Sequence, residues 1–350
     1  MKYFDNHLNI AAFGEVMFRL SSDKHERIEQ VNRFNCSFAG SEANVVVNLS
    51  IWGECSKFLT VLPNNVIGNK CLNDIRRFGV NVSNILRNDG RMGLMFIETG
   101  VGIRGSNIIY DRKHSAISTT NLDKDYFVSA FKDCNWFHYT GITPALSLIS
   151  QDNCREAIIA AQKNGLTISV DLNYRSKLWK YGSKAPDVMP ELVTYADIIM
   201  ANEEDVFLSL GIESDMINIE KGILPINSYK KVANKIFSKF PKAQVLAFTL
   251  RKSLNASING WSAILFTRNK FFQSESYNIN PIIDRVGAGD SFAAGLILGL
   301  NRYKNNYQKI LDFATAASCL KHSIQGDYCL VSIAEVESLM KGNKSGRIKR

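Results

Sequence analysis

Short apolar segments alternate with longer helical patterns along almost the whole chain, and this rhythm limits the fold more than any other feature. The patterns between the apolar segments place apolar residues at i, i+3 and i+4, the spacing of an amphipathic helix. Strands that alternate with helices usually pair in parallel. We therefore expect a three-layer α/β fold with a mainly parallel sheet. The expected strands are 10–13, 56–62, 136–139, 166–170, 198–201 and 245–249, and the expected helices are 42–52, 66–78, 150–164, 229–240, 289–301 and 307–323.

Two segments break this rhythm, at about 16–38 and 92–112. The second mixes strand-like residues with repeated glycines. We expect both to leave the main sheet and form a small β-sheet lid over the carboxyl ends of the core strands, where open α/β sheets bind ligands. Residues 1–340 would then be one domain with inserted lid segments, followed by a basic, disordered tail at 341–350.

Composition favours a cytoplasmic protein that needs no structural metal or disulfide. The 350 residues are 45% hydrophobic, enough for one large core. The seven cysteines are odd in number and form no C-x-x-C pair, which is typical of reduced thiols, and the histidines lack zinc-ligand spacing. No apolar run approaches the roughly 20 residues that cross a bilayer. The polar residues 1–7 replace the apolar region that a signal peptide needs.

The net charge of +9 raises the question of nucleic acid binding. Much of the excess lies in the last ten residues, which read as a solvated end. The remaining positive charge suits ATP and small anionic substrates equally well. A nucleic-acid binder therefore stays an alternative that depends on charge alone, and we expect neither nucleic acid nor membrane as a partner. The basic residues of the tail are Lys341, Lys344, Arg347, Lys349 and Arg350.

The strongest chemical signal is the sequence D-R-V-G-A-G-D-S-F-A-A-G at 284–295, where a β-like segment turns into an apolar helix. The small residues Gly287, Ala288 and Gly289 leave backbone N–H groups free at the helix N-terminus, where they can hold a phosphoryl group. Asp290, at the same end, is placed to accept a proton from an attacking hydroxyl, and the helix dipole should keep it ionised. A tight turn followed by an N-capping aspartate is the structural alternative.

This segment resembles the C-terminal signature of the ribokinase/PfkB carbohydrate kinases, D-x-x-G-A-G-D-x-F-x-x-G. The resemblance implies a ribokinase-like fold and phosphorylation of a sugar hydroxyl, with ATP and Mg²⁺ as cofactors and a monovalent cation as a further candidate. Arg285 stands where the family usually has threonine, which puts in question a role of that hydroxyl at a phosphate or cation.

Further segments extend the resemblance from Gly14 to about Met340 and point to the 2-keto-3-deoxygluconate (KDG) kinases. Residues 38–45 resemble the family's G-G-x-x-x-N segment, which implies that Gly40 passes close to the sugar, while Ser41 is expected to cap the following helix. Residues 110–116 resemble the lid segment that holds the sugar, through Tyr110 and Arg112. A solvated charge cluster on a hairpin is the other interpretation. Met95 falls where relatives often carry a lid tyrosine.

The segment D-L-N-Y-R-S-K-L-W at 171–179 resembles the D-x-N-x-R-x-x-L-W stretch of KDG kinases. Arg175 can bind a planar carboxylate through two hydrogen bonds, which a sugar acid requires and a neutral hexose does not. The resemblance implies that Asn173 reaches the ATP phosphates or the sugar. An arginine at a strand end that pairs with a surface acid is the alternative for Arg175.

Three more matches complete the expected site. Asn202 to Asp205 resembles the family's N-x-x-E motif, which implies that Asn202 contacts the nucleotide and that Asp205 holds Mg²⁺ through water; a helix-terminal acid is the alternative. Thr249 and Arg251 occupy the place of a nucleotide loop, without its K-x-G glycine. The run K-H-S-I-Q-G-D at 321–327 resembles a KDG kinase segment in which Asp327 binds a sugar hydroxyl. The structural alternative for this run is a helix C-cap at Gly326.

Together these features predict phosphorylation of KDG at its primary hydroxyl. The alternatives are the same chemistry on fructose, ribose or a related keto-deoxy acid, and a non-catalytic sugar sensor of the same fold, which would usually have lost Asp290. The exposed edges of the lid strands further suggest a homodimer or a larger homo-oligomer.

Overall fold

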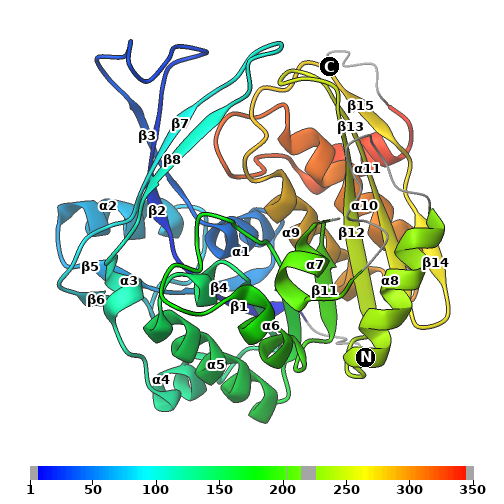
Figure 1. Ribbon diagram of the computed structural model, residues 1–350, viewed down its shortest axis with the longest axis horizontal. Coiled ribbons are helices and arrows are strands. Elements are labelled where there is room, and N and C mark those ends of the chain that lie inside the picture. The colour runs from blue at the N-terminus through cyan, green and yellow to red at the C-terminus, as the bar shows by residue number, and fades with distance from the viewer. Residues whose placement is uncertain (1–6, 203, 214–225, 344–350) are drawn as a thin grey trace.

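The computed structural model describes residues 7–202, 204–213 and 226–343. Within these residues, a sheet of nine strands lies between two layers of helices (Figure 1). Its order is β14-β13-β12-β11-β10-β9-β1-β4, with β15 also paired to β13. The run from β4 to β12 is parallel, and β13 to β15 add antiparallel strands beyond it. The expected α/β fold is confirmed. The strands are β1 (Asn9–Phe13), β4 (Cys55–Leu59), β9 (Trp136–Thr140), β10 (Thr167–Asp171), β11 (Ile198–Ala201), β12 (Val245–Ser253), β13 (Asn259–Thr267), β14 (Phe271–Gln273) and β15 (Tyr277–Ile279).

The parallel strands are rich in buried apolar residues because helices cover both faces of the sheet. Successive side chains of β1 point to opposite faces. Ala11 and Phe13 join one core cluster, and Ile10 joins the other. The first cluster includes residues of α5 (Leu148–Lys163), α6 (Ala185–Val193) and α8 (Ile226–Lys239), and the second includes residues of α1 (Ser41–Ile51), α9 (Ala288–Arg302) and α10 (Tyr307–Lys321).

A separate small sheet extends from the main body, at the upper left of Figure 1. Its strand order is β3-β2-β7-β8, and β2 pairs parallel to β7 with Phe18 opposite Leu94. The segments expected to leave the main sheet supply these strands, and β3 leads directly into α1. The small sheet is thus joined to the core beside the N-terminus of that helix. Its strands are β2 (Met17–Ser21), β3 (Asn35–Ala39), β7 (Leu94–Glu98) and β8 (Asn107–Asp111).

The strand expected at 56–62 is divided between two sheets. Gly14 N donates to Leu59 O, the last bond of β4 to the main sheet, and Leu86 N then donates to Thr60 O. The chain changes partners there, which an unbroken apolar run cannot reveal. The remaining elements are β5 (Val61–Pro63), α2 (Val66–Arg76), β6 (Leu86–Asn88), α3 (Ala116–Thr119), α4 (Lys124–Ala130), η1 (Thr143–Ala145), α7 (Asp205–Leu210) and α11 (Ile333–Met340).

The described residues contain no helix that is long and apolar enough to cross a membrane. All seven cysteines lie within the described residues, and none of them forms a disulfide bond there. Of the expected basic tail, Lys341 to Asn343 follow α11, and 344–350 lie outside the described residues.

Candidate active site

A cavity of about 940 Å³ lies at the carboxyl ends of β10, β11 and β12, between the N-termini of α1 and α9 and the small sheet. Ala288 is buried beside it. The other site residues named from the sequence all line it, so segments from Gly40 to Asp327 meet in one place. These lining residues are Gly40, Tyr110, Arg112, Asn173, Arg175, Asn202, Asp205, Thr249, Arg251, Gly287, Gly289, Asp290 and Asp327.

The glycine loop before α9 has the shape that its sequence predicts. Gly287 is the N-cap of α9 and adopts a left-handed conformation, with φ of +81°. A Cβ at Gly287 would lie 2.1 Å from Asp327 O, so a larger residue would be excluded by sterics as well as by conformation. The helix therefore starts with its first N–H groups beside the cavity, and Asp290 lies in the first turn.

Asp290 is held by two side chains of α1. Ser41 Oγ donates a hydrogen bond to Oδ1, and Asn44 Nδ2 donates one of 2.6 Å to Oδ2. The prediction that Ser41 caps α1 is therefore wrong, since the N-cap is Gly40 and no side chain caps the helix. Burial raises the pKa of Asp290, against the lowering expected from the helix dipole, and the bonds from Ser41 and Asn44 oppose that rise. A carboxylate with a raised pKa accepts a proton more readily.

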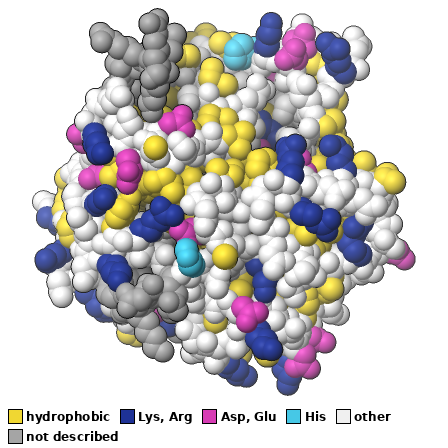
Figure 2. Space-filling view, turned by 180° about the vertical axis from the view of Figure 1, so that it is seen from behind, with side chains coloured by type: hydrophobic (Ala, Val, Ile, Leu, Met, Phe, Trp, Pro, Cys, Tyr) yellow, Lys and Arg dark blue, Asp and Glu magenta, His cyan; other side chains and the backbone are white. Residues whose placement is uncertain are grey.

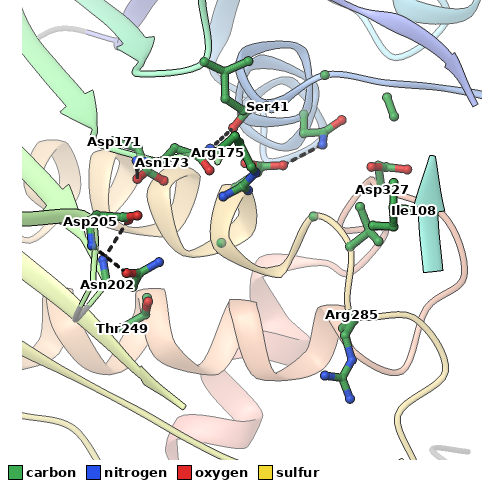
Figure 3. A pocket seen from close by; sticks show the side chains of 18 of the residues that line it. Ser41, Ile108, Asp171, Asn173, Arg175, Asn202, Asp205, Thr249, Arg285 and Asp327 are labelled. Atoms are coloured by element: carbon green, nitrogen blue, oxygen red, sulfur yellow. Dashed lines mark hydrogen bonds between the residues drawn. The ribbon is translucent and has the colours of Figure 1, made fainter. Parts of the chain in front are cut away.

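Asn173 extends this network to β10. Its Nδ2 donates to Ser41 Oγ at 3.0 Å, and its backbone N–H donates to Asp171 Oδ1 at 3.1 Å (Figure 3). Its φ of +38° turns the chain at the end of the strand, a conformation that asparagine tolerates better than most residues. Asn173, Ser41 and Asp290 thus form one chain of hydrogen-bonded side chains.

Asp171, which the sequence analysis left without a role, lies with Asp205 and Asp290 in an acidic region. Burial raises the pKa of Asp171 well above its usual value, and the negative charges of Asp205 and Asp290 add to the effect. The Arg175 guanidinium acts in the opposite direction on all three. The sequence signal for Asp171 was its position, since it begins the D-x-N-x-R segment and is the last residue of β10. Arg175 itself is exposed and donates to Tyr174 O at 2.9 Å, and no ion pair joins it to an acid among the residues that the structure describes.

Asp205 is fixed by backbone groups at the start of α7. Oδ1 accepts from Tyr174 N at 3.0 Å, and Oδ2 accepts from Asn202 N at 3.1 Å. Asn202 Oδ1 in turn accepts from the N–H groups of Glu204 and Asp205, so the two side chains brace each other (Figure 3). Burial raises the pKa of Asp205. Among the described residues, no three His, Cys, Asp or Glu side chains are grouped so as to hold a metal ion.

A second buried acid anchors the N-terminus of α1. Glu42 Oε1 accepts from Thr140 N at 3.1 Å and from Thr140 Oγ1 and Thr143 Oγ1 at 2.7 Å. Only glycine fits at position 14, because a Cβ there would lie 2.2 Å from Glu42 Oε2. Burial raises the pKa of Glu42 to about 6, and its hydrogen bonds oppose the rise. This packing fixes the helix that carries Ser41 and Asn44.

Arg112 reaches the cavity in partnership with Glu15, which the sequence analysis did not identify. Its Nε donates to Glu15 Oε2 at 2.7 Å, and its guanidinium carbon lies 5.5 Å from the centre of the Tyr110 ring. Arg112 is therefore not part of a solvated charge cluster. Glu15 Oε1 is buried and has no hydrogen-bond partner among the described residues. Glu15 directly follows Gly14 at the end of β1, a place where acids are functional candidates.

Asp327 is bound by another missed residue, Arg19 of β2. The Arg19 guanidinium donates to Asp327 Oδ2 through Nη1 and to Asp284 Oδ2 through Nη2, the latter at 2.6 Å. All three side chains are nearly or fully buried. These ion pairs connect the small sheet to Asp284, which precedes the glycine loop, and to Asp327, whose backbone packs against Gly287. A charged residue in a strand was the only signal.

The nucleotide side of the expected site is formed by β12 and the loop after it. Thr249 lines the cavity, and the Arg251 guanidinium carbon lies 5.5 Å from the centre of the Trp261 ring. Arg285 donates to Ala256 O at 2.7 Å, and its side chain lies at the lower right of Figure 3, below Asp327. Burial lowers its pKa. Arg285, present where threonine is usual, therefore holds the loop that lacks the usual glycine.

Comparisons with known proteins find relatives that match most of this chain. A family model described as pfkB family carbohydrate kinase matches residues 7–329. The crystal structure of 2-dehydro-3-deoxygluconokinase from Thermotoga maritima has a TM-score of 0.89 and 39% identity, covering 96% of this chain and 100% of that one. The 2-dehydro-3-deoxygalactonokinase of Haloferax volcanii is 29% identical, over 96% of this chain and 98% of its own. The 2-dehydro-3-deoxygluconokinase of Bacillus subtilis is 28% identical, over 84% and 83%.

Proposed function

Because this chain belongs to the pfkB family of carbohydrate kinases, we propose that it transfers the γ-phosphoryl group of ATP to the primary hydroxyl of KDG. KDG is the compound also called 2-dehydro-3-deoxygluconate, and the product is its 6-phosphate. The observation that carries the proposal is that one cavity contains both the Asp290 carboxylate and the guanidinium groups of Arg175 and Arg112. A base suits the hydroxyl end of a sugar acid, and a guanidinium suits its carboxylate end.

In this proposal Asp290 accepts the proton of the attacking hydroxyl. Ser41 and Asn44 orient its two oxygens, so the lone pair that takes the proton is fixed before the sugar binds. The N–H groups at Gly287 to Gly289 stabilise the negative charge of the transferring group at the N-terminus of α9. No covalent intermediate with the protein is needed, because positioning and charge stabilisation are sufficient for phosphoryl transfer.

The acidic residues at the strand ends suit a divalent cation that arrives with ATP. Mg²⁺ usually keeps several waters and binds through one or two carboxylates and the substrate phosphates. Asp205 would hold it through water, with Asp171 beside it, and the ion would offset the mutual repulsion of these acids. Asn202, Asn173, Thr249 and Arg251 would contact the nucleotide. The ion supplies charge neutralisation on the phosphate oxygens.

The sugar specificity rests on Arg175 and on the relatives. Two of the relatives described above are named 2-dehydro-3-deoxygluconokinase and one 2-dehydro-3-deoxygalactonokinase, and the sugars in these names differ in the configuration of one carbon. A neutral sugar such as fructose or ribose would leave the exposed Arg175 without a carboxylate. We therefore rank KDG first and its galacto epimer second. The cytoplasm and a homo-oligomer remain our expected location and state.

The nucleic-acid alternative receives no support from the visible surface. On the face shown in Figure 2, the Lys and Arg side chains of the described residues are dispersed among acidic ones rather than gathered in one stripe. A groove that follows a phosphate backbone needs such a stripe. Retention on DNA that weakens steeply with salt, and persists in a protein cut after Met340, would revive this alternative.

A coupled assay of ADP release tests the proposal directly. The purified protein is supplied with ATP, Mg²⁺ and, in turn, KDG, its galacto epimer, fructose and ribose. We expect the highest kcat/KM on KDG, and a kcat lowered by roughly 10²–10⁴-fold in the Asp290→Asn variant. A higher kcat/KM on fructose or ribose than on either sugar acid would contradict the assignment.

A further inference from the structure

Lys321 at the end of α10 is a buried cation for which the proposed reaction has no use. Its side chain has 0% relative exposure. The ammonium donates to two backbone carbonyl oxygens, to Asp284 O at 3.2 Å and to Ile324 O at 3.0 Å. Burying an ammonium is costly unless it is well coordinated, so a lysine in such a place needs a structural or functional reason.

The two carbonyl groups belong to segments that meet at the glycine loop. Asp284 lies three residues before Gly287, and Ile324 lies three residues before Asp327. Gly287 packs directly against the backbone of Asp327, because a Cβ added to Gly287 would lie only 2.1 Å from Asp327 O. Gly326 N also donates to Asp284 Oδ2, at 3.1 Å. By binding both carbonyl groups, the Lys321 ammonium connects the backbone before Gly287 with the backbone before Asp327. These two stretches meet at the N-terminus of α9.

The charges around Lys321 are already balanced. Arg19 and Lys321 contribute two positive charges, and Asp284 and Asp327 contribute two negative ones; all four side chains are buried. Burial lowers the pKa of Lys321, and the neighbouring Asp284 and Asp327 oppose that effect. A metal cation added to this group would leave it with an excess positive charge in a region of low dielectric constant.

We propose that the Lys321 ammonium acts as a built-in monovalent cation, which holds the carbonyl groups of Asp284 and Ile324 and so fixes the glycine loop in its phosphate-binding shape. Lys321 is a positioning residue, since it acts through the loop and touches neither substrate. The inference rests on the proposed kinase activity for its functional meaning. It predicts that the protein works without added K⁺ or Na⁺, in contrast to the cation dependence that remained a candidate from the sequence.

The experiment compares cation dependence in three variants and the wild type. Lys321→Ala leaves space for an ion, Lys321→Met fills that space without charge, and Lys309→Ala changes a lysine of the same helix that does not line the cavity. Each is assayed for KDG kinase activity with tetramethylammonium as the only monovalent cation, and again with NH₄⁺ or K⁺ titrated in. Binding of a non-hydrolysable ATP analogue, by thermal shift and calorimetry, is measured under the same conditions.

We expect the wild type and Lys309→Ala to be insensitive to NH₄⁺ and K⁺. Lys321→Ala should lose about 10- to 150-fold in kcat/KM, the range for a charge-assisted hydrogen bond, and should recover part of it as NH₄⁺ or K⁺ is added. Lys321→Met should lose as much and recover less. This difference in rescue separates a cation role from general support of the fold, which no ion would restore.

Two results would overturn the proposal: activation of the wild type by K⁺ or NH₄⁺, or a folded Lys321→Ala protein whose loss no cation relieves. If Lys321→Ala does not fold, the cation titration of the wild type and the activity loss of Lys321→Met still test the proposal. If the wild type phosphorylates none of the sugars, the proposed function fails by itself. Cation dependence of ATP-analogue binding then tests the role of Lys321 separately.

Discussion

Asn44 Nδ2 donates a hydrogen bond of 2.6 Å to Asp290 Oδ2, which joins the first helix of the chain to the start of α9. With Ser41 on the other oxygen, both oxygens of the proposed base are bound before any substrate is present. Positions far apart in the sequence thus define a single carboxylate orientation. The predictions below follow from this arrangement and from its neighbours.

The first prediction concerns the proposed base. Asp290→Asn keeps the shape of the side chain and removes the site that takes the proton. It should lower kcat by roughly 10²–10⁴-fold, the range for a positioned general base, while ATP and KDG still bind. Asp312→Asn is the matched control, since Asp312 lies on α10 outside the cavity and also has a pKa raised by burial. Activity of Asp290→Asn within threefold of the wild type would remove the residue from this role.

The second prediction concerns substrate choice. Arg175→Leu should reduce kcat/KM on KDG by about 10- to 150-fold at saturating ATP, because a charge-assisted hydrogen bond is worth roughly 1.5–3 kcal/mol. Any weak turnover of fructose should change much less. Arg77→Leu, at an exposed arginine that does not line the cavity, should leave both sugars unaffected. Equal losses of kcat/KM on the two sugars would instead indicate that Arg175 contacts the nucleotide rather than the sugar.

The third prediction concerns the small sheet as a lid. Hydrogen exchange measured by mass spectrometry should slow at 22–34 and 99–107 when KDG is added, because these largely exposed connections lie in the two lid segments. The strand around Arg19 should change little, since its side chain is already buried and paired. Unchanged exchange at a saturating concentration of KDG would mean that the segments are ordinary surface hairpins.

The fourth prediction is a pH dependence of stability that comes from Glu42. Its pKa is about 6 in the folded protein and near 4.5 in the unfolded chain, so the folded state binds the proton more tightly. The free energy of unfolding should therefore fall as pH rises from about 4.5 to about 6, by roughly 2 kcal/mol from this group. Denaturant unfolding of the wild type and Glu42→Gln at pH 4.5 and 7 measures the difference. Identical changes with pH in both proteins would contradict the prediction.

The parts of the fold that depend on local pattern could be predicted from the sequence. The expected strand at 198–201 coincides with β11, because apolar residues at strand length and flanking helices need no distant information. The glycine loop was found for the same reason. The division of 56–62 between β4 and β5 was not, since it depends on Thr60 meeting Leu86.

Site residues that act through distant partners were the ones missed. Glu15 is explained only by Arg112, and Arg19 only by Asp284 and Asp327. Ser41 was assigned a helix cap because serine before a helix usually caps it, but the hydroxyl is used by Asp290 instead. In each case a contact across a large sequence separation outweighs the local preference.

The Arg19 ion pairs described above join the small sheet mechanically to the glycine loop. β2 cannot shift without pulling on Asp284 and Asp327, and these residues flank the loop at Gly287. In the proposed function, a sugar bound under the sheet and a nucleotide bound at the loop would therefore act on the same piece of backbone. By thermodynamic reciprocity, each substrate should change the affinity of the other by the same factor. The Arg19 ion pairs are thus the route through which such a coupling would pass between the two substrates.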